Sequence, residues 1–427
     1  MLPKGNACCL SATTSGQPAG RQRNGLEIAV SCRAPCARKL DLRMLDLNIV
    51  RLSTWAELAP YEGQWDCLAQ GVPFRSWAWC STWWKHYGDH GLPGEGGPEL
   101  YVLAAFNQAD RLVGIAPWYR HWSGSLGSTL EWLGTGEVCS DYLGLLCEPA
   151  FVEPVTRAMA AWLTDAACGE RYPLSADRWD LLSLPQCDAQ DMATRRLAGE
   201  LESRGCGLHC RPTSRCWRIA LPLDWARYEA TLSKSHRKQI RRADRNLLHS
   251  GRTALHCTSR LDDLPGALAI LVDLHQRRRQ ALGQPGCFAA PRFAAFHRDV
   301  LAPMFRRGQC ELHWLELDGT AIAAEYHLTG NGIVYAYQSG IAPEALRYEP
   351  GRLLSLAVLQ RAIALGYRGF DLCRGDERYK AHWRAQPRES LDIRIAANRP
   401  AARLRLGLWV AGSNVKRWMK QTVGADQ

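Results

Sequence analysis

The sequence predicts a mixed α/β fold, of the α+β kind, in which two successive halves each carry a mixed, largely antiparallel sheet flanked by helices. Two observations support this prediction. The same order of elements, a hairpin, a third strand, a helix and a closing strand, occurs once before residue 190 and again after residue 310. Long helical patterns lie between these two sets, instead of the regular strand–helix alternation of a doubly wound parallel sheet.

The elements of the first set follow from hydrophobic periodicity. Residues 100–106 and 112–119 flank a turn-like segment, as the two strands of a hairpin do. The helix carries Val155, Met159 and Leu163 at helical spacing. The predicted elements are strands at 100–106, 112–119, 141–147 and 179–184 and a helix at 154–167.

The second set repeats this order. Asp318-Gly319 is a hairpin signal, and Pro350-Gly351 is typical of a helix start. Between the sets, one or two helices end at Gly251, where glycine is a natural helix stop. The predicted elements are strands at 311–317, 321–328, 333–340 and 370–373, a helix at 350–366, and connecting helices at 225–249, 264–281 and 293–305.

Four segments follow from this organisation. Regular patterning begins near Leu45, so we expect residues 1–43 to be a disordered extension; the alternatives are a transit peptide, which its Arg- and Ser-containing composition resembles, and a true start at Met44. Residues 44–210 form the predicted N-terminal domain, called the first half below. Residues 211–398, the second half, form the C-terminal domain. Residues 399–427 form a basic amphipathic tail, which we expect to pack on the core, with contact to a membrane surface as the alternative.

Composition restricts the class of protein and of ligand. With 427 residues, 46% of them apolar, the chain can bury two sizeable cores. The net charge of +11, of which +5 belongs to residues 1–43, suits an anionic ligand such as a phosphorylated cofactor, but it gives no argument for DNA.

The cysteines and the lack of export signals predict a cytoplasmic protein. The 17 cysteines include no CxxC pair, and the densest group, Cys206, Cys210 and Cys216 around His209, lacks the spacing of a zinc site. We therefore expect reduced thiols and no metal. No secretory signal is recognisable, and no apolar run approaches the roughly 20 residues of a membrane span.

A predicted strand-to-helix connection is the first candidate site. The strand at 333–340 leads to a helix that starts at Pro350-Gly351, with Arg347 and Arg352 beside it. Free amides and the positive end of the helix dipole suit an anionic group there, and Gly351 lets the backbone approach a phosphate. The alternative is an ordinary helix start without a ligand.

Two further groups could carry proton transfer. Asp371 lies in the predicted closing strand, and Tyr379 and Lys380 follow it. The tyrosine could donate a proton, the lysine could stabilise negative charge, and the aspartate could orient either one. Glu325 and His327 are two residues apart on one strand, so they share a face, and either could act as a base. A salt-bridged surface turn and a solvent-facing strand are the respective alternatives.

A basic run and a tryptophan cluster allow other ligands. Residues 233–245 could bind the phosphates of a cofactor or of tRNA, although a solvated helix face is the default interpretation. Trp77, Trp79, Trp83 and Trp84 could stack on sugar rings, but such residues more often fill cores.

The order and spacing of several motifs resemble the CelD-type (cellulose biosynthesis) acetyltransferase family, a branch of the GNAT superfamily related to the FemABX peptidyltransferases. The motifs are Pro73-Phe-Arg-Ser-Trp-Ala-Trp with Trp83-Trp84, Ser140-Asp-Tyr-Leu-Gly-Leu-Leu, Leu232-Ser-Lys-Ser-His-Arg-Lys-Gln-Ile-Arg-Arg, Leu274-His-Gln-Arg-Arg, Leu317-Asp-Gly-Thr-Ala-Ile-Ala-Ala, Glu349-Pro-Gly-Arg-Leu-Leu and Asp371-Leu-Cys-Arg-Gly-Asp-Glu-Arg-Tyr-Lys.

The resemblance implies two tandem GNAT-like domains and acyl transfer from acetyl-CoA or another acyl-CoA. The donor would lie along the strand that carries Tyr337 and Ser339, with its phosphates at Gly351. Tyr379 matches the slot of the tyrosine that protonates the leaving thiolate, and Lys380 resembles the lysine of the Fem-type C-terminal motif. The loop from Arg347 departs from the GNAT phosphate pattern by one extra residue before Gly351 and by the lack of a second small residue.

The function expected from the resemblance is an acyltransferase acting on an amine or hydroxyl acceptor of unknown identity. A glycan is one candidate acceptor, in polysaccharide or cell-envelope biosynthesis. One alternative is a Fem-like transferase that uses aminoacyl-tRNA, which the absence of a long inserted helical hairpin disfavours. The other is a non-catalytic module that binds a glycan or a partner protein.

Overall fold

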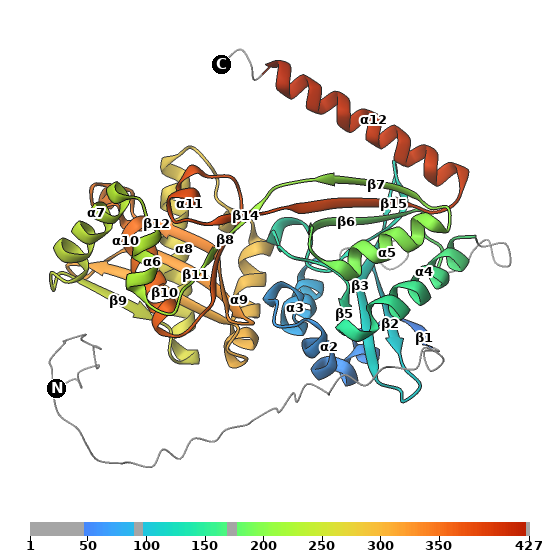
Figure 1. Cartoon of the computed structure of the whole chain (residues 1–427), viewed down its shortest axis with the longest axis horizontal. Helices are drawn as coiled ribbons and strands as arrows, with labels where there is room; N and C mark the ends of the chain where they lie inside the picture. The colour runs from blue at the N-terminus through green and yellow to red at the C-terminus, as the bar shows by residue number, and fades with distance from the viewer. Residues whose placement is uncertain (1–46, 89–96, 169–176, 424–427) are drawn as a thin grey trace. The chain divides into compact units, whose positions relative to one another are not determined.

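The computed structural model of the chain describes residues 47–88, 97–168 and 177–423, which lie in one compact unit, Leu45–Gln427. The extension predicted at residues 1–43 lies outside the described residues. Two mixed sheets with helices on their faces make up this unit (Figure 1). The mixed α/β fold class is therefore confirmed.

The first sheet has eight strands and is antiparallel except where β4 and β6 run parallel. Its strand order is β1-β2-β3-β4-β6-β15-β7, with β5 paired to β3. The strands are β1 (Asn48–Leu52), β2 (Glu99–Phe106), β3 (Leu112–Ser123), β4 (Gly127–Trp132), β5 (Leu146–Cys147), β6 (Leu181–Asp188), β7 (Gly207–Pro212) and β15 (Ser390–Ala396). The helices of this part are α1 (Trp55–Leu58), α2 (Glu62–Leu68), α3 (Trp77–Tyr87), α4 (Val152–Cys168) and α5 (Met192–Ser203).

The second sheet has seven strands in the order β14-β8-β13-β12-β11-β10-β9, and only β12 and β13 run parallel. The strands are β8 (Cys216–Ala220), β9 (Thr253–Cys257), β10 (Cys310–Leu317), β11 (Thr320–Gly330), β12 (Ile333–Ile341), β13 (Gly369–Arg374) and β14 (Gln386–Arg388). The helices are α6 (Trp225–Thr231), α7 (Lys234–Ala243), α8 (Leu264–Ala281), α9 (Pro291–Arg306), α10 (Pro350–Ala364), α11 (Arg378–His382) and the terminal α12 (Pro400–Val423).

The repeated order of elements is present in both sheets. In β2-β3-β4-α4-β6 and in β10-β11-β12-α10-β13, an antiparallel hairpin and a third antiparallel strand precede a helix, and the helix leads to a strand parallel to the third. The third strand of the first set is β4, which the sequence analysis did not predict.

The strand predicted at 141–147 is wrong for most of its length, because Asp141 and Tyr142 bond to the second half and Leu143 makes only an isolated bridge to Cys187 of β6. The Asp141 carboxylate accepts hydrogen bonds from the Arg374 backbone amide at 3.1 Å and from Arg374 Nε at 2.7 Å. Tyr142 has φ 60° and donates its hydroxyl to Asp371 Oδ2 at 2.6 Å. Only Leu146–Cys147 form a strand.

The chain crosses between the sheets twice. It passes from β7 to β8 just after the expected boundary at residues 210/211, and it returns to the first sheet at β15, where Ile393 pairs with Leu184. A strand from the end of the second half thus completes the sheet of the first half.

Aromatic side chains fill the junction between the two halves. Trp79 is fully buried and packs edge-on against Phe296 and Tyr337 of the second half, at centroid distances of 4.9 and 5.5 Å. Trp83 is also buried. These tryptophans form core rather than a surface for sugar rings.

We predict that Asp371 is essential for stability. Its carboxylate is completely buried and accepts hydrogen bonds from Tyr142, from Arg218 Nε at 2.8 Å and from the Cys373 amide at 2.8 Å. Asp371→Ala leaves the half-buried Arg218 charge without its partner and the Tyr142 hydroxyl without its acceptor, so the free energy of unfolding should fall by about 3–5 kcal/mol in urea titrations. Asp376→Ala removes an exposed pair with Arg215 and should cost about 1 kcal/mol or less. Equal losses would contradict this assignment.

Burial of His297 predicts a pH-dependent stability. It lowers the pKa of this imidazole to about 3, whereas a histidine in an unfolded chain titrates near about 6.5. Below about pH 6.5 only the unfolded chain takes up a proton at this imidazole. The contribution of His297 to the free energy of unfolding is therefore complete above about pH 6.5 and is lost progressively as the pH falls toward 3. His297→Phe should reduce the slope of unfolding free energy against pH by about 1.4 kcal/mol per unit between pH 6 and 4, while His249→Phe at an exposed site should not. An unchanged slope in His297→Phe would refute the prediction.

Candidate active site

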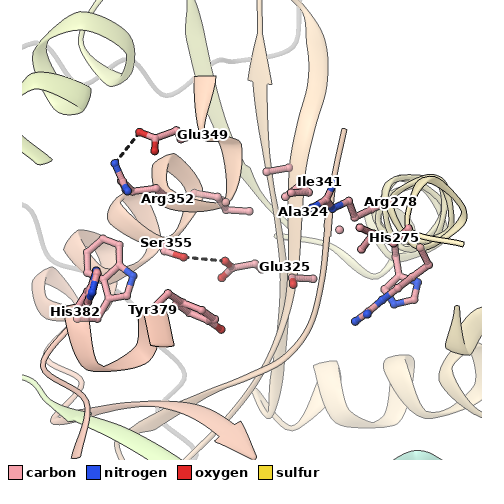
Figure 2. A pocket seen from close by; sticks show the side chains of 18 of the residues that line it. His275, Arg278, Ala324, Glu325, Ile341, Glu349, Arg352, Ser355, Tyr379 and His382 are labelled. Carbon is pink, nitrogen blue, oxygen red and sulfur yellow. Dashed lines mark hydrogen bonds and ion pairs between the residues drawn. The ribbon is translucent and has the colours of Figure 1, made fainter. Parts of the chain in front are cut away.

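A cavity of about 440 Å³ lies at the ends of β11 and β12, where α7, α8, α10 and α11 meet (Figure 2). Five of the ten predicted site residues line it: Glu325, Ser339, Gly351, Arg352 and Tyr379. The other lining residues are His236, His275, Arg278, Arg279, Leu282, Ala323, Ala324, Gly340, Ile341, Glu349, Leu354, Ser355, His382 and Trp383.

Glu325 is the carboxylate at the centre of the cavity wall. Its side chain is held from two sides. Oε2 lies 2.6 Å from His327 Nε2. Oε1 accepts a hydrogen bond from Ser355 Oγ at 3.3 Å, as Figure 2 shows. Period-two geometry puts both strand residues on the face that α10 covers. His327 is 1% exposed and does not line the cavity, so it acts on the cavity only through Glu325.

Tyr379 comes from α11, on the opposite side of Glu325 from the strand (Figure 2). Burial of its hydroxyl, together with the carboxylates of Glu377 and Glu325, raises the pKa of this phenol above its usual range. The residue as a whole is half exposed, and it lines the cavity. It is therefore a protonated donor at neutral pH, next to a carboxylate acceptor.

The first turn of α10 forms the end of the cavity. The amides at a helix start have no partner within the helix and carry the positive end of its dipole. A Cβ added to Gly351 would meet only Ile341 Cγ2 at 3.8 Å, so this residue faces open space. Arg352 lines the cavity and pairs with Glu349 at 2.6 Å. This end can hold an anionic group.

Much of the cavity wall comes from α7 and α8, and its residues were not predicted from the sequence. His236 Nδ1 lies 2.9 Å from the His382 carbonyl oxygen, and His275 Nδ1 lies 3.0 Å from Gln276 Oε1. Burial lowers the pKa of both imidazoles, so they are neutral at pH 7. Arg278 and Arg279 add positive charge. The signals were the basic run at 233–245 and the Leu274-His-Gln-Arg-Arg motif, but neither indicated a cavity.

Two predicted catalytic residues, Asp371 and Lys380, are buried outside the cavity wall. Asp371 is bonded to Tyr142 and Arg218 at the junction of the halves. Lys380 is 1% exposed, and its Nζ donates to the carbonyl oxygens of Cys373, Arg374 and Gly375 at 2.9–3.1 Å. Neither side chain lines the cavity. Lys380 closes the turn that follows β13 and so positions the neighbouring Tyr379.

Two predicted donor-binding residues also lie away from the cavity. Tyr337 donates its hydroxyl to the Val138 carbonyl oxygen at 2.6 Å and packs on Trp79 in the junction. The Arg347 guanidinium lies over the Tyr348 ring, 4.7 Å from its centroid, on the surface. The structure thus brings Ser339, Gly351 and Arg352 to the cavity but not these two.

One group in the described residues has the donor set of a metal site. Ligand atoms of Cys257, Glu311 and His313 lie within 4.8 Å of one another at the β9 and β10 edge. Arg361 Nη2 is 3.7 Å from Cys257 Sγ, however, and its charge opposes a cation there. The group resembles a neutralised polar cluster more than a metal centre, and we assign no ion to it.

The predicted basic run forms a surface next to the cavity. Its cationic side chains line a shallow hollow of about 280 Å³ on one face of α7 and its extension: Lys234, Arg237, Lys238, Arg241 and Arg245. The opposite face buries His236 and Ile240. The run therefore combines a cavity wall with a solvated cationic face.

Part of the second half matches a known protein family. Residues 234–381 match the profile of the acetyltransferase (GNAT) domain, a range that contains all ten predicted site residues. No curated protein matches the sequence. The similarity to a GNAT acetyltransferase domain therefore concerns residues 234–381, and this match does not distinguish the CelD-type branch.

Solved structures share the fold of the whole unit. A crystal structure of FemX is 10% identical, covers 84% of this chain and 99% of its own, and has a TM-score of 0.57. A conserved protein of unknown function from Bacteroides thetaiotaomicron is 10% identical, with 81% and 100% coverage and a TM-score of 0.52. A tandem GNAT protein from the clavulanic acid biosynthesis pathway is 16% identical, with 83% and 99% coverage and a TM-score of 0.41. At these identities the first two structures show a likeness of fold alone, and the TM-score of the third is too low to support the fold assignment.

Proposed function

We propose that this protein is an acyltransferase that moves an acyl group from acetyl-CoA or another acyl-CoA to an amine or hydroxyl acceptor. The observation that carries the proposal is the cavity within the GNAT domain, where the paired Glu325, the protonated Tyr379 and the helix start at Gly351 face one space. A base, an acid and an anion site are the groups that direct acyl transfer requires.

The donor phosphates occupy the first turn of α10 in this proposal. Unpaired helix amides and Arg352 attract the pyrophosphate, and Arg278 and Arg279 on the facing wall add to the positive potential. The acyl thioester then points along β12 past Ser339 toward Glu325, since these two residues are direct cross-strand partners. No described residue of the first half lines this cavity.

The chemical step balances without a metal. The acceptor nitrogen or oxygen attacks the thioester carbonyl carbon, and Glu325 takes the proton that the nucleophile loses. The tetrahedral intermediate collapses with cleavage of the carbon–sulfur bond, and the thiolate takes the proton of the Tyr379 hydroxyl. Exchange with solvent returns both residues to their starting states. His327 and Ser355 orient the Glu325 carboxylate through their hydrogen bonds.

The acceptor is proposed only at the level of its nucleophile. A glycan of a polysaccharide or of the cell envelope is one candidate, which rests on the family resemblance alone. The buried tryptophans of the first half give it no support.

The cationic face of α7 favours one second candidate function, transfer from aminoacyl-tRNA. Its five basic side chains adjoin the cavity wall that carries His236. RNA binding through this face would weaken steeply as salt increases, because bound counterions are released.

We predict that Gly351→Glu abolishes donor binding. The new carboxylate would enter the open space at the helix start, where it repels phosphate without displacing the core. Calorimetric titration of the full chain with acetyl-CoA should give saturable binding for wild type and for the matched Gly351→Ala, and none for Gly351→Glu. Failure of wild type to bind any acyl-CoA would overturn the proposed donor and favour aminoacyl-tRNA or a non-catalytic module.

We predict that Tyr379→Phe slows turnover by about 10²–10⁴-fold, because the thiolate loses its proton donor. Donor affinity should stay within about twofold, since the hydroxyl makes no contact with the phosphates at Gly351 in this proposal. Release of CoA thiol is measured with the amine or hydroxyl that gives the highest wild-type rate. Tyr348→Phe, which alters a tyrosine outside the cavity, serves as the control. Unchanged turnover in Tyr379→Phe would remove this residue from the mechanism.

A further inference from the structure

The terminal helix α12 has two apolar faces, of which the protein covers only one. The inner face rests on the edge of the first sheet, with Ala402 and Leu406 buried. Trp409 lies under the Arg394 guanidinium, 3.8 Å from its centre, and beside His209 of β7. This face explains how the helix attaches.

The outer face is apolar although no part of the described chain covers it. Leu404, Leu408 and Val415 are 64%, 65% and 54% exposed. With Ala411, which is also exposed, they recur at spacings of four, three and four residues, so they form one stripe opposite Leu406. In Figure 1, α12 lies at the outside of the first sheet, beyond β7. An apolar stripe of this kind on a surface helix marks a binding face.

Charge indicates what covers the stripe. No acidic residue occurs from 393 to 425, whereas the same stretch holds seven basic residues, including Lys416, Arg417 and Lys420. Asp180 binds Arg399 at 2.5 Å and Arg405 at 3.4 Å, and Arg394 lies 3.9 Å from Asp392. The other four basic residues, Arg403, Lys416, Arg417 and Lys420, add positive charge to a stretch that holds no acidic residue. The helix is thus apolar outward and cationic, as interfacial helices on anionic bilayers are.

A second feature beside the helix points the same way. The start of α12 borders a hollow of about 820 Å³ that Trp122 of β3 also lines. Trp122 is 65% exposed, and Arg120 and Arg178 line the same hollow. Tryptophan next to arginine is typical of segments at the level of lipid headgroups.

We propose that α12 docks this protein on the surface of an anionic lipid bilayer, with Leu404, Leu408 and Val415 inserted among the headgroups and the net positive charge of the tail attracting the helix to this surface. The inference does not depend on the proposed acyl transfer. Within the described residues, no helix has both the length and the apolar character to cross a membrane, so the contact is with the surface. A second copy of this chain is disfavoured as the occupant, because two helices of this charge would repel each other.

The test is co-sedimentation of the full chain with vesicles. Wild type should bind vesicles of one part phosphatidylglycerol to three parts phosphatidylcholine, bind pure phosphatidylcholine vesicles much less, and lose affinity as salt increases. The double variant L404E/L408E should bind the anionic vesicles at least about tenfold more weakly. L223E/L365E places the same charges at exposed leucines outside α12 and should bind like wild type. L404S/L408S removes the apolar stripe without adding charge and should also lose binding.

Three outcomes would overturn the proposal. The first is that wild type does not bind anionic vesicles. The second is that the serine variant, folded by circular dichroism, binds them as wild type does, because the contact would then be made by another basic surface such as α7. The third is that sedimentation velocity shows a wild-type dimer that the serine variant dissociates while neither binds vesicles, which would assign the stripe to a second copy of the chain.

Discussion

The buried carboxylate of Asp371 is the constraint on which the rest of the second half depends. It lies within β13, accepts a hydrogen bond from the Cys373 amide of the same strand, and joins this strand to two segments that are far away in sequence, Tyr142 of the first half and Arg218 of β8. A charge in this position is tolerated only because every neighbour donates to it or is cationic. Burial raises the pKa of this carboxyl and Arg218 opposes that rise, so the pairing also determines whether the group is charged.

The contacts at this junction also position part of the cavity wall. Directly after Asp371, Asp141 of the first half binds Arg374, and the next turn is closed by Lys380, whose ammonium satisfies three consecutive carbonyl oxygens. Tyr379 is therefore placed by a chain of buried polar contacts that begins in the first half. Although the first half contributes no described residue to the cavity wall, it fixes the segment that carries the proposed acid.

The sequence predicted local features well and long-range ones poorly. The second set of strands was found because hairpin signals and apolar alternation are local, and period two placed Glu325 and His327 on one face. Burial of Asp371 could not be predicted, since its partner Tyr142 lies 229 residues away. The partners of Lys380 are nearby carbonyl oxygens, but a basic residue after a strand has the same local pattern whether it closes a turn or faces a ligand. The strand at 141–147 was predicted wrongly because the partners of Asp141 and Tyr142, which are Arg374 and Asp371, are also distant in the sequence.

A row of polar residues on β10 and β11 of the second sheet supports the Glu325 side chain. Beneath α10, its hydrogen bond to His327 continues to the His313 ring, 4.8 Å away, and His313 Nε2 lies 3.1 Å from Glu311. In this row the imidazoles of His327 and His313 lie between the carboxylates of Glu325 and Glu311, so each carboxylate faces an imidazole nitrogen. The hydrogen bonds from His327 and Ser355 hold the Glu325 carboxylate in one orientation at the cavity, which is the property that a positioned base requires.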